Sequence, residues 1–366
     1  MFKVKGISDR LNMPVKSQEE IIRSSDIPEE MMDPLIRDFR SLILYNLETS
    51  GAVLTTDNQV KIYTDGQAKF EGLRTALRRA SRFIHIQYYI IKNDEVFDSI
   101  VPILEDKVRE GVEVRILYDG MGGRFMPKRR WEELRRAGIL VGVFFPPILG
   151  WLNLRVNYRN HRKIVVIDGN VGFVGGFNIG REYISKDPGF GYWRDTHLRI
   201  TGEAVMSLQI RFALDWNYAT GENLFKNEAY FRTDLKKKTD VRRDKERPAW
   251  PDPELEGSQV GMQIIASGPD TREPHIRNNY LELFHKAKHH IYIQTPYFVP
   301  DDAIFSALKM AALSGVDVRL MIPCKPDHPF VYRATCSYAG ELLDYGAKVY
   351  ILSLIHISEP TRPRLI

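Results

Sequence analysis

Apolar residues recur along this chain with two alternating periods, one typical of strands and one typical of helices. The segment VKIYTDGQAKFEGLRTALRRASRFIHIQYYII, residues 60–91, begins as a strand and continues as a helix with an apolar residue at every third or fourth position. It ends in a buried strand rich in Ile and Tyr. Two further helix–strand pairs follow, at residues 98–120 and 128–145. This succession predicts an α/β fold with a largely parallel, mixed sheet flanked by helices.

The same succession returns about 200 residues later in the chain. IHIQYY (Ile84–Tyr89) matches IYIQTPY (Ile291–Tyr297), REGVEVRILY matches LSGVDVRLMI, and EELRRAGILV matches GELLDYGAKV. Three landmarks in one order predict two homologous α/β halves, the second of them incomplete. We expect the following organisation: an N-terminal helical segment at 1–50, a first half at 51–220, a polar basic linker at 221–258, a second, truncated half at 259–351, and a tail at 352–366.

Composition and charge narrow the class of protein. Apolar residues make up 43% of the chain and charged residues 27%, which is typical of a globular protein. The net charge of +5 suits partners that carry phosphate, such as an anionic membrane surface. The basic run between Lys236 and Arg247 is expected to be a solvated loop, with contact to anionic lipid head groups as the alternative.

Membrane spans, secretory signals and cysteine frameworks are not evident in the sequence. The best apolar segment, residues 137–154, is broken by Pro146 and Pro147 and flanked by charge, so no uninterrupted apolar run approaches the roughly 18–20 residues that span a bilayer. The first 20 residues lack the apolar core of a secretory signal. Cys324 and Cys336 form neither a disulfide framework nor a metal-ligand pattern. We therefore expect a soluble or peripheral protein with no metal.

Candidate chemistry gathers in one stretch, NYRNHRKIVVIDGNVGFVGGFNIG, residues 157–180. His161 and Lys163 share one face of an extended strand, because side chains alternate with a period of two. A histidine serves as nucleophile or proton donor near neutral pH, and a lysine places a positive charge on phosphate oxygens. Asp168 ends the buried strand IVVID and is expected to orient a partner and to limit its charge.

The second part of this stretch turns tightly through a pair of glycines. Gly175 and Gly176 are expected to let backbone N–H groups approach a ligand closely. Asn178 adds a neutral hydrogen-bond donor. A histidine alone is most often a structural residue, but these spaced polar groups followed by GG-x-N favour a phosphate site.

Two further segments supply candidates with open alternatives. Arg194 and Asp195, in GYWRDTH, are either support for the site or a structural ion pair. Tyr297, in TPYF, either borders the site or packs as an aromatic residue at the end of a strand. The histidines of LFHKAKHH are interpreted as a solvated helix end: His285, His289 and His290.

The pattern H-x-K-x4-D followed by GG-x-N resembles the HKD motif of the phospholipase D superfamily. The surrounding segments NYRNHRKIVVIDG, GFVGGFNIG, GYWRDTHLRI, IQTPYF, SGVDVR and YRATCSYAGELL together resemble bacterial cardiolipin synthases, from Leu54 to Ile351. The resemblance implies two phospholipase D-like halves and the joining of two phosphatidylglycerols into cardiolipin with release of glycerol. It also implies location at the bacterial cytoplasmic membrane, with no metal or other cofactor and no nucleic acid as a partner.

The resemblance further implies roles for the residues of the motif. One histidine attacks the phosphodiester, forming a phosphohistidine, and its counterpart in the other half protonates the leaving alcohol. His161 is then the candidate nucleophile, Lys163 and Asn178 are phosphate contacts, and Asp168 supports the site. The sequence leaves open which of the two histidines attacks.

The resemblance predicts a second H-x-K soon after GAKVYI, residues 346–351. The sequence reads LSLIHISEPTRPRLI instead, where His356 is followed by Ile357 and Ser358. One reading frame of a transposase-type sequencing adapter encodes LSLIHISEPTR, so we expect this tail to be an artefact of library construction. The chain as printed is therefore expected to be inactive alone.

The sequence is also compatible with two functions other than phosphatidyl transfer. A phospholipase D-type phosphodiesterase or nuclease with one motif would complete its site by homodimerisation, although the internal repeat argues against that. A non-catalytic module would use the phosphate pocket to bind anionic lipid without turnover.

Overall fold

The computed structural model describes residues 16–20, 22–23, 34–146, 159–231, 260–268, 271–325 and 329–352. They fall into two compact units. The first holds 51–188 and 192–264 and the residues before Phe39, and the second holds Phe39–Ser50, Gly189–Gly191 and the residues from Ile265. Helix α2 (Pro34–Ser50) changes direction at Phe39, whose backbone is not helical. None of the helices in these ranges is long and apolar enough to cross a membrane.

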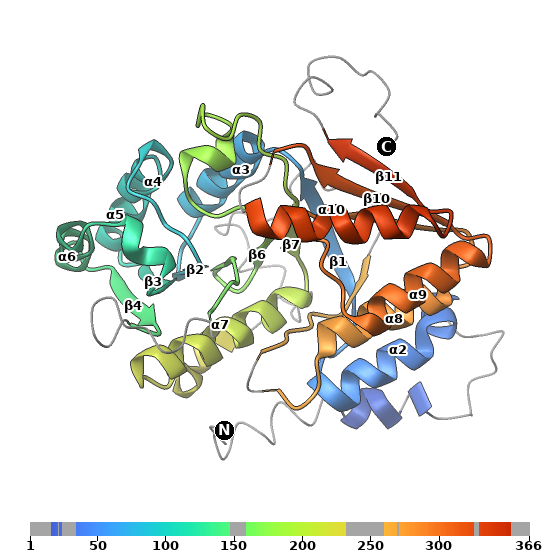
Figure 1. Ribbon diagram of the computed structural model, residues 1–366. Coiled ribbons are helices and arrows are strands. Elements are labelled where there is room, and N and C mark those ends of the chain that lie inside the picture. The colour runs from blue at the N-terminus through green and yellow to red at the C-terminus, as the bar shows by residue number, and fades with distance from the viewer. Residues whose placement is uncertain are drawn as a thin grey trace. The chain divides into compact units, whose positions relative to one another are not determined.

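The first unit is built on a mixed sheet in the order β4-β3-β2-β5-β6-β7-β1-β8 (Figure 1). Strands β2, β3 and β4 pair in parallel, as helix crossovers require, and the remaining neighbours pair antiparallel. The bounds are β1 (Thr55–Tyr63), β2 (Phe83–Tyr88), β3 (Glu113–Asp119), β4 (Leu140–Phe144), β5 (Ile164–Ile167), β6 (Val171–Gly175), β7 (His197–Thr201) and β8 (Val260–Met262).

Helices cover both faces of this sheet (Figure 1). One face packs against α3 (Gly66–Arg78), α4 (Glu95–Asp98), α5 (Val101–Arg109) and α6 (Lys128–Arg136), and the other against α7 (Ala204–Thr220). Strand β2 shows the alternation that makes this possible, because Ile84 and Ile86 enter the core under α3 and α5 while Phe83 enters the core under α7. Short 3₁₀ helices at Gly122–Phe125, Arg181–Ile184, Leu224–Lys226 and Glu228–Phe231 complete the unit.

The second unit repeats the parallel part of the first. Strands β9 (His290–Gln294), β10 (Asp317–Pro323) and β11 (Lys348–Leu352) pair in parallel in the order β11-β10-β9, which mirrors β4-β3-β2. Helices α8 (His275–Lys286), α9 (Asp302–Leu313) and α10 (Pro329–Leu343) alternate with them. The four glycines that precede matching strands all have φ between 86° and 90°, a left-handed helix ending that favours glycine: Gly111, Gly138, Gly315 and Gly346.

This repeat confirms the predicted α/β fold with two related halves. Most of the predicted linker lies outside the described residues, including its basic run, and so does the tail from Ser353 with His356. The three histidines predicted at a solvated helix end are exposed, but only His285 lies in the last turn of α8, whereas His289 follows the helix and His290 begins β9.

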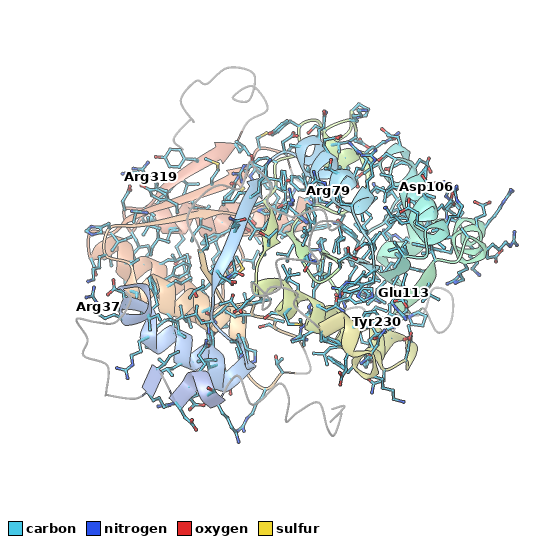
Figure 2. The ribbon with its side chains drawn as sticks, turned by 180° about the vertical axis from the view of Figure 1, so that it is seen from behind. Arg37, Arg79, Asp106, Glu113, Tyr230 and Arg319 are labelled. Atoms are coloured by element: carbon cyan, nitrogen blue, oxygen red, sulfur yellow. The ribbon has the colours of Figure 1, made fainter. Side chains whose placement is uncertain are left out.

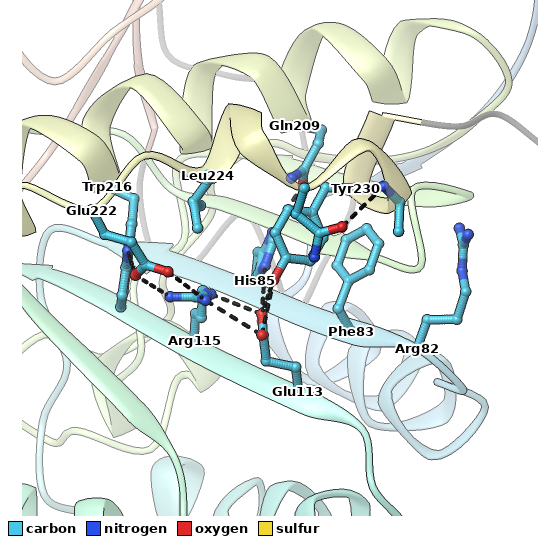
Figure 3. A network of polar contacts seen from close by, with 12 residues as sticks. Arg82, Phe83, His85, Glu113, Arg115, Gln209, Trp216, Glu222, Leu224 and Tyr230 are labelled. Carbon is cyan, nitrogen blue, oxygen red and sulfur yellow. Dashed lines mark hydrogen bonds and ion pairs between the residues drawn. The ribbon is translucent and has the colours of Figure 1, made fainter.

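A network of charged side chains ties the end of α7 to the sheet in the first unit (Figure 3). The Glu113 carboxylate accepts hydrogen bonds from Arg115 Nε at 2.8 Å and from the Tyr230 hydroxyl at 2.7 Å. Arg115 also donates to both oxygens of Glu222, at 2.6 and 2.9 Å. Figure 2 shows Glu113 and Tyr230 beside each other. The network fixes the chain after α7 against β3, and through it the position of α7 on the sheet.

We predict that Glu113→Gln weakens this attachment in a pH-dependent way. Burial alone would raise the pKa of Glu113, but hydrogen bonds from Arg115 and Tyr230, together with the nearby His85 ring, outweigh it and lower the pKa to about 2. The folded-state pKa is below the usual 4.5, so the carboxylate stabilises the fold fully above that pH and loses its contribution as the pH falls toward 2.

The melting temperatures of the parent and of Glu113→Gln should therefore differ most near neutral pH and converge in acid. Glu132→Gln, which removes a 59% exposed carboxylate from α6, is the matched control and should leave the melting temperature almost unchanged. A gap between parent and Glu113→Gln that stays constant down to acid pH would contradict this account.

Candidate active site

The segment from Arg159 to Lys163 precedes β5 and is held by a buried polar cluster on the α7 side. Asp215 of α7 accepts hydrogen bonds from Gln87 Nε2 at 2.7 Å and from Asn160 Nδ2 at 3.0 Å. It also pairs with Arg162 Nη1 at 2.9 Å. Gln87 donates in addition to Asn160 Oδ1 at 2.9 Å. With Asn160 and Arg162 committed to this face, the alternation of side chains turns the residues between and beside them the other way.

His161 and Lys163 meet on that opposite side. Lys163 Nζ lies 3.0 Å from His161 Nε2 and donates to the His161 carbonyl oxygen at 2.7 Å. The Tyr89 ring lies against both, 4.8 Å from the His161 ring between centroids and 5.5 Å from Lys163 Nζ. Lys163 is 3% exposed, whereas His161 is open to solvent. The pair thus presents an accessible imidazole backed by a buried amine.

Burial and mutual repulsion set the charges of this pair. Although one side of the imidazole is open to solvent, its partial burial, and then the charge of Lys163, lowers the pKa of His161 to about 4. Burial lowers the pKa of Lys163 to about 7, although the negative charge of Asp195 opposes it. Between these values the imidazole is neutral while the lysine is charged, so Lys163 donates to His161 Nε2 and the ring proton resides on Nδ1.

The two glycines serve a purpose that differs from the expected one. The N–H of Gly176 donates to Thr196 O at 2.9 Å, so it is used within the sheet and does not face a ligand. A Cβ on Gly176 would lie 2.0 Å from Asp195 Oδ1, and one on Gly175 would lie 2.4 Å from His197 Cα. The glycines therefore let the segment that carries Asp195 approach close enough for its charge to act on Lys163.

Asp195 is held in place by its own neighbours. Its carboxylate accepts from Thr196 N at 2.7 Å and from the side chain of Trp193. Burial raises the pKa of Asp195, and these hydrogen bonds and the charges of Lys163 and Arg194 oppose that rise. The charge of Arg194 acts on Asp195, and the charge of Asp195 acts on Lys163; the choice between a structural ion pair and support for the site stays a prediction.

The structure corrects the expectation for Asp168. His161 and Lys163 precede β5, and Asp168 follows its last residue, Ile167, so the strand separates them. The Asp168 carboxylate accepts from the backbone N–H groups of Ser81, Arg82 and Phe83 at 2.8–2.9 Å and from the Ser81 hydroxyl at 3.0 Å. Asp168 therefore fastens the turn that begins β2 and does not orient a reacting group.

Asn178 is buried in the first unit, whereas Tyr297 is exposed in the second. Asn178 is 4% exposed, accepts from Ile90 N at 3.0 Å, and donates to the Tyr183 hydroxyl at 2.8 Å, which leaves one N–H of its amide for a ligand. Tyr297 belongs to the second unit, where it is 43% exposed and its N–H donates to Thr295 Oγ1 at 3.2 Å.

Sequence reasoning missed the residues that orient the motif, namely Gln87, Asn160 and Asp215, as well as Tyr89. The alternation within NHRK contained a usable signal, because a polar residue at every position of a strand implies polar partners on both faces. Nothing local in the sequence identifies Asp215 as that partner. Among the described residues, no group of three or more His, Cys, Asp or Glu side chains is arranged to hold a metal ion.

We predict that Asp168→Ala destabilises the fold by about 3 kcal/mol, because it leaves buried N–H groups without a charged acceptor. The measurement is the free energy of unfolding in urea. Asp106→Ala, which removes an exposed carboxylate of α5, is the control and should change this free energy by less than about 0.5 kcal/mol. Equal stability of Asp168→Ala and the parent would show that the turn does not depend on this residue.

We also predict that the affinity for a soluble phosphodiester falls as the pH rises through about 7. Lys163 is charged below its pKa and neutral above it, and only the charged form attracts the anion. Calorimetric titration with glycerophosphoglycerol, which remains a monoanion over this range, provides the measurement. The parent should show the loss, and Lys163→Gln should not. An affinity independent of pH in the parent would refute the charge assignment.

Comparison with known proteins places this chain among described relatives. Residues 73–190 and 280–359 match the family described as "Cardiolipin synthase, PLD-like domain". A cardiolipin synthase of Oceanobacillus iheyensis is 44% identical over 337 residues, which cover 92% of this chain and 65% of that protein. One of Staphylococcus aureus strain Mu50 is 50% identical over 313 residues, which cover 85% of this chain and 59% of that protein. The chain thus spans less than two thirds of the length of these relatives.

A solved structure shares the fold. The phosphatidylserine synthase of Haemophilus influenzae Rd KW20 superposes with a TM-score of 0.53 at 15% identity, over 81% of this chain and 73% of that chain. The family match extends over both units, and its first segment includes the His161–Lys163 pair and Asn178. The chain therefore belongs to the cardiolipin synthase, PLD-like domain family.

Proposed function

We propose that the first unit of this chain supplies half of an active site that transfers a phosphatidyl group from one phosphatidylglycerol to another, giving cardiolipin and glycerol. The observation that carries the proposal is the accessible His161 ring held with its Nε2 atom 3.0 Å from the buried Nζ of Lys163. The relatives named cardiolipin synthase, at 44% and 50% identity, support this choice of substrate.

In the first step His161 attacks the phosphorus of the donor lipid. The low pKa of His161 favours the unprotonated imidazole at neutral pH, which suits a nucleophile better than a proton donor. Lys163 turns from Nε2 to a phosphate oxygen and stabilises the charge that develops there, and the remaining N–H of Asn178 assists. The bond from phosphorus to the glycerol head group breaks, and the departing oxygen takes a proton from a general acid.

In the second step a hydroxyl of the acceptor phosphatidylglycerol attacks the phosphohistidine. The hydroxyl gives its proton to a general base, the bond from phosphorus to His161 breaks, and cardiolipin leaves. Water in place of the acceptor gives phosphatidic acid, so transfer and hydrolysis differ only in the hydroxyl that reaches phosphorus. The substrate lipids place the reaction at an anionic bacterial membrane surface, which the net charge of +5 also suits.

The test uses the chain itself and a hybrid in which residues 54–351 replace the matching stretch of the Staphylococcus aureus relative. We expect the hybrid to form cardiolipin from phosphatidylglycerol vesicles, and His161→Ala to lower the rate by at least about a thousandfold, because a nucleophile is lost. Lys163→Gln should lower it by about a hundredfold or more. Chromatography of the lipid products measures both effects.

Cardiolipin formation that survives His161→Ala would overturn the assignment of the nucleophile. Phosphatidic acid as the main lipid product would favour a hydrolase, and cleavage of added DNA would favour a nuclease. Turnover by the unmodified chain would refute the expectation that it is inactive alone. An acid-labile phosphoenzyme that forms in the parent and not in His161→Ala would support the first step independently of the product.

A further inference from the structure

One cationic side chain beside the site has no hydrogen-bond partner among the residues that the structure describes. The Arg159 side chain is 10% exposed, and its Nε, Nη1 and Nη2 atoms are all buried without a hydrogen bond to any other described residue. A guanidinium stays charged at every physiological pH, and a buried cation with unsatisfied donors is costly to keep. Such an arrangement is typical of a side chain that awaits an anion.

The carboxylate of Asp119 forms an ion pair with Arg159 but no hydrogen bond to its guanidinium. Asp119 Oδ1 lies 3.7 Å from Arg159 Nη1, too far for a hydrogen bond. The Asp119 oxygens instead accept backbone N–H groups, from Met121 at 2.8 Å and from Asn160 at 3.0 Å. Asp119 therefore balances part of the charge of Arg159 and leaves the five N–H groups of the guanidinium for another acceptor.

Arg159 is two residues from His161 along the chain, and its charge acts on Tyr89. Burial and the charge of Asp119 raise the pKa of Tyr89, and Arg159 and the exposed Arg124 lower it, so these charged groups act on the phenol. The same tyrosine ring contacts His161 and Lys163. Residues 159, 161 and 163 also alternate with Asn160 and Arg162, which are committed to the α7 side.

The proposed transfer, on which this inference rests, requires two phosphates in the site at once. The donor phosphate is at His161 and Lys163, and the acceptor carries its own phosphodiester at the other end of a three-carbon alcohol. Water and glycerol, the competing acceptors, carry no phosphate. A second cationic side chain near Lys163 would bind the phosphate of the lipid acceptor and so favour that acceptor over water and glycerol.

We propose that Arg159 binds the phosphodiester of the acceptor lipid, in a second anion subsite next to the His161–Lys163 pair. The planar guanidinium matches two phosphate oxygens in a bidentate contact, for which a lysine is a poorer substitute. Arg159 is thus a residue that determines the specificity for the acceptor and takes no part in the chemical step.

The test is equilibrium binding by the full chain, which does not depend on turnover. Calorimetry with glycerophosphoglycerol, the water-soluble head group, is performed near pH 6 at low salt, where Lys163 is charged. We expect two sites in the parent and one in Lys163→Gln. Adding Arg159→Gln to Lys163→Gln should weaken the remaining site by at least about tenfold, as expected for losing hydrogen bonds to a charged group. Adding Arg159→Lys should restore part of that affinity.

The matched control is Arg129→Gln in the same Lys163→Gln background. It removes an arginine that is 88% exposed on α6, and it should leave the binding unchanged. The melting temperature of each variant reports whether a loss reflects unfolding. A folded Arg159→Gln double variant that binds as well as Lys163→Gln would overturn the proposal, and so would a complete loss of binding in Lys163→Gln alone.

Competition distinguishes a lipid head group from free phosphate as the source of the anion. Vesicles of phosphatidylglycerol should displace glycerophosphoglycerol from the Arg159 subsite in Lys163→Gln, and vesicles of phosphatidylcholine should not. Displacement by inorganic phosphate but not by phosphatidylglycerol vesicles would refute the acceptor-lipid assignment. If the subsite behaves as expected while the hybrid forms no cardiolipin, only the proposed function fails.

Discussion

The buried carboxylate of Asp215 is the contact on which the geometry of the site depends. Asp215 lies on α7, which covers one face of the sheet. It accepts hydrogen bonds from Gln87 of β2 and from Asn160 and Arg162 in the segment before β5. A carboxylate with several charge-assisted and neutral hydrogen bonds has little freedom to move. Because side chains alternate, committing Asn160 and Arg162 to this anchor fixes the opposite direction of His161 and Lys163 without any further contact to them.

The electrostatics of the pair follow from that placement. Two basic groups 3.0 Å apart, one of them buried, do not both carry a positive charge at neutral pH, so the charge rests on the lysine and the imidazole stays neutral. A bound phosphate offsets the cost of burying the positive charge of Lys163, because the negative charge of the phosphate stabilises the ammonium. The glycines contribute indirectly, by admitting the segment that carries Asp195.

Much of this organisation could be predicted from the sequence. Hydrophobic periods and repeated glycines predict the α/β halves because they depend on local rules, and Gly111 and Gly315 share a left-handed backbone. The motif likewise locates His161 and Lys163. The role of Asp168 could not be predicted, because the backbone N–H groups that it accepts, those of Ser81, Arg82 and Phe83, lie 85–87 residues away along the chain. Asp215 and Arg159 depend on contacts between distant elements or on burial, which no local pattern encodes.

The position of Asp168 shows that the three residues of the motif do not all serve the same purpose. Under the proposed function the reaction requires His161 and Lys163, whereas the start of β2 requires Asp168, so two different physical requirements act on residues written as one signature. A related protein in which another acceptor held the turn before β2 would keep the histidine and the lysine and lack the aspartate. Searches that require all three letters would pass over such enzymes, and searches built on H-x-K with its polar neighbours would retain them.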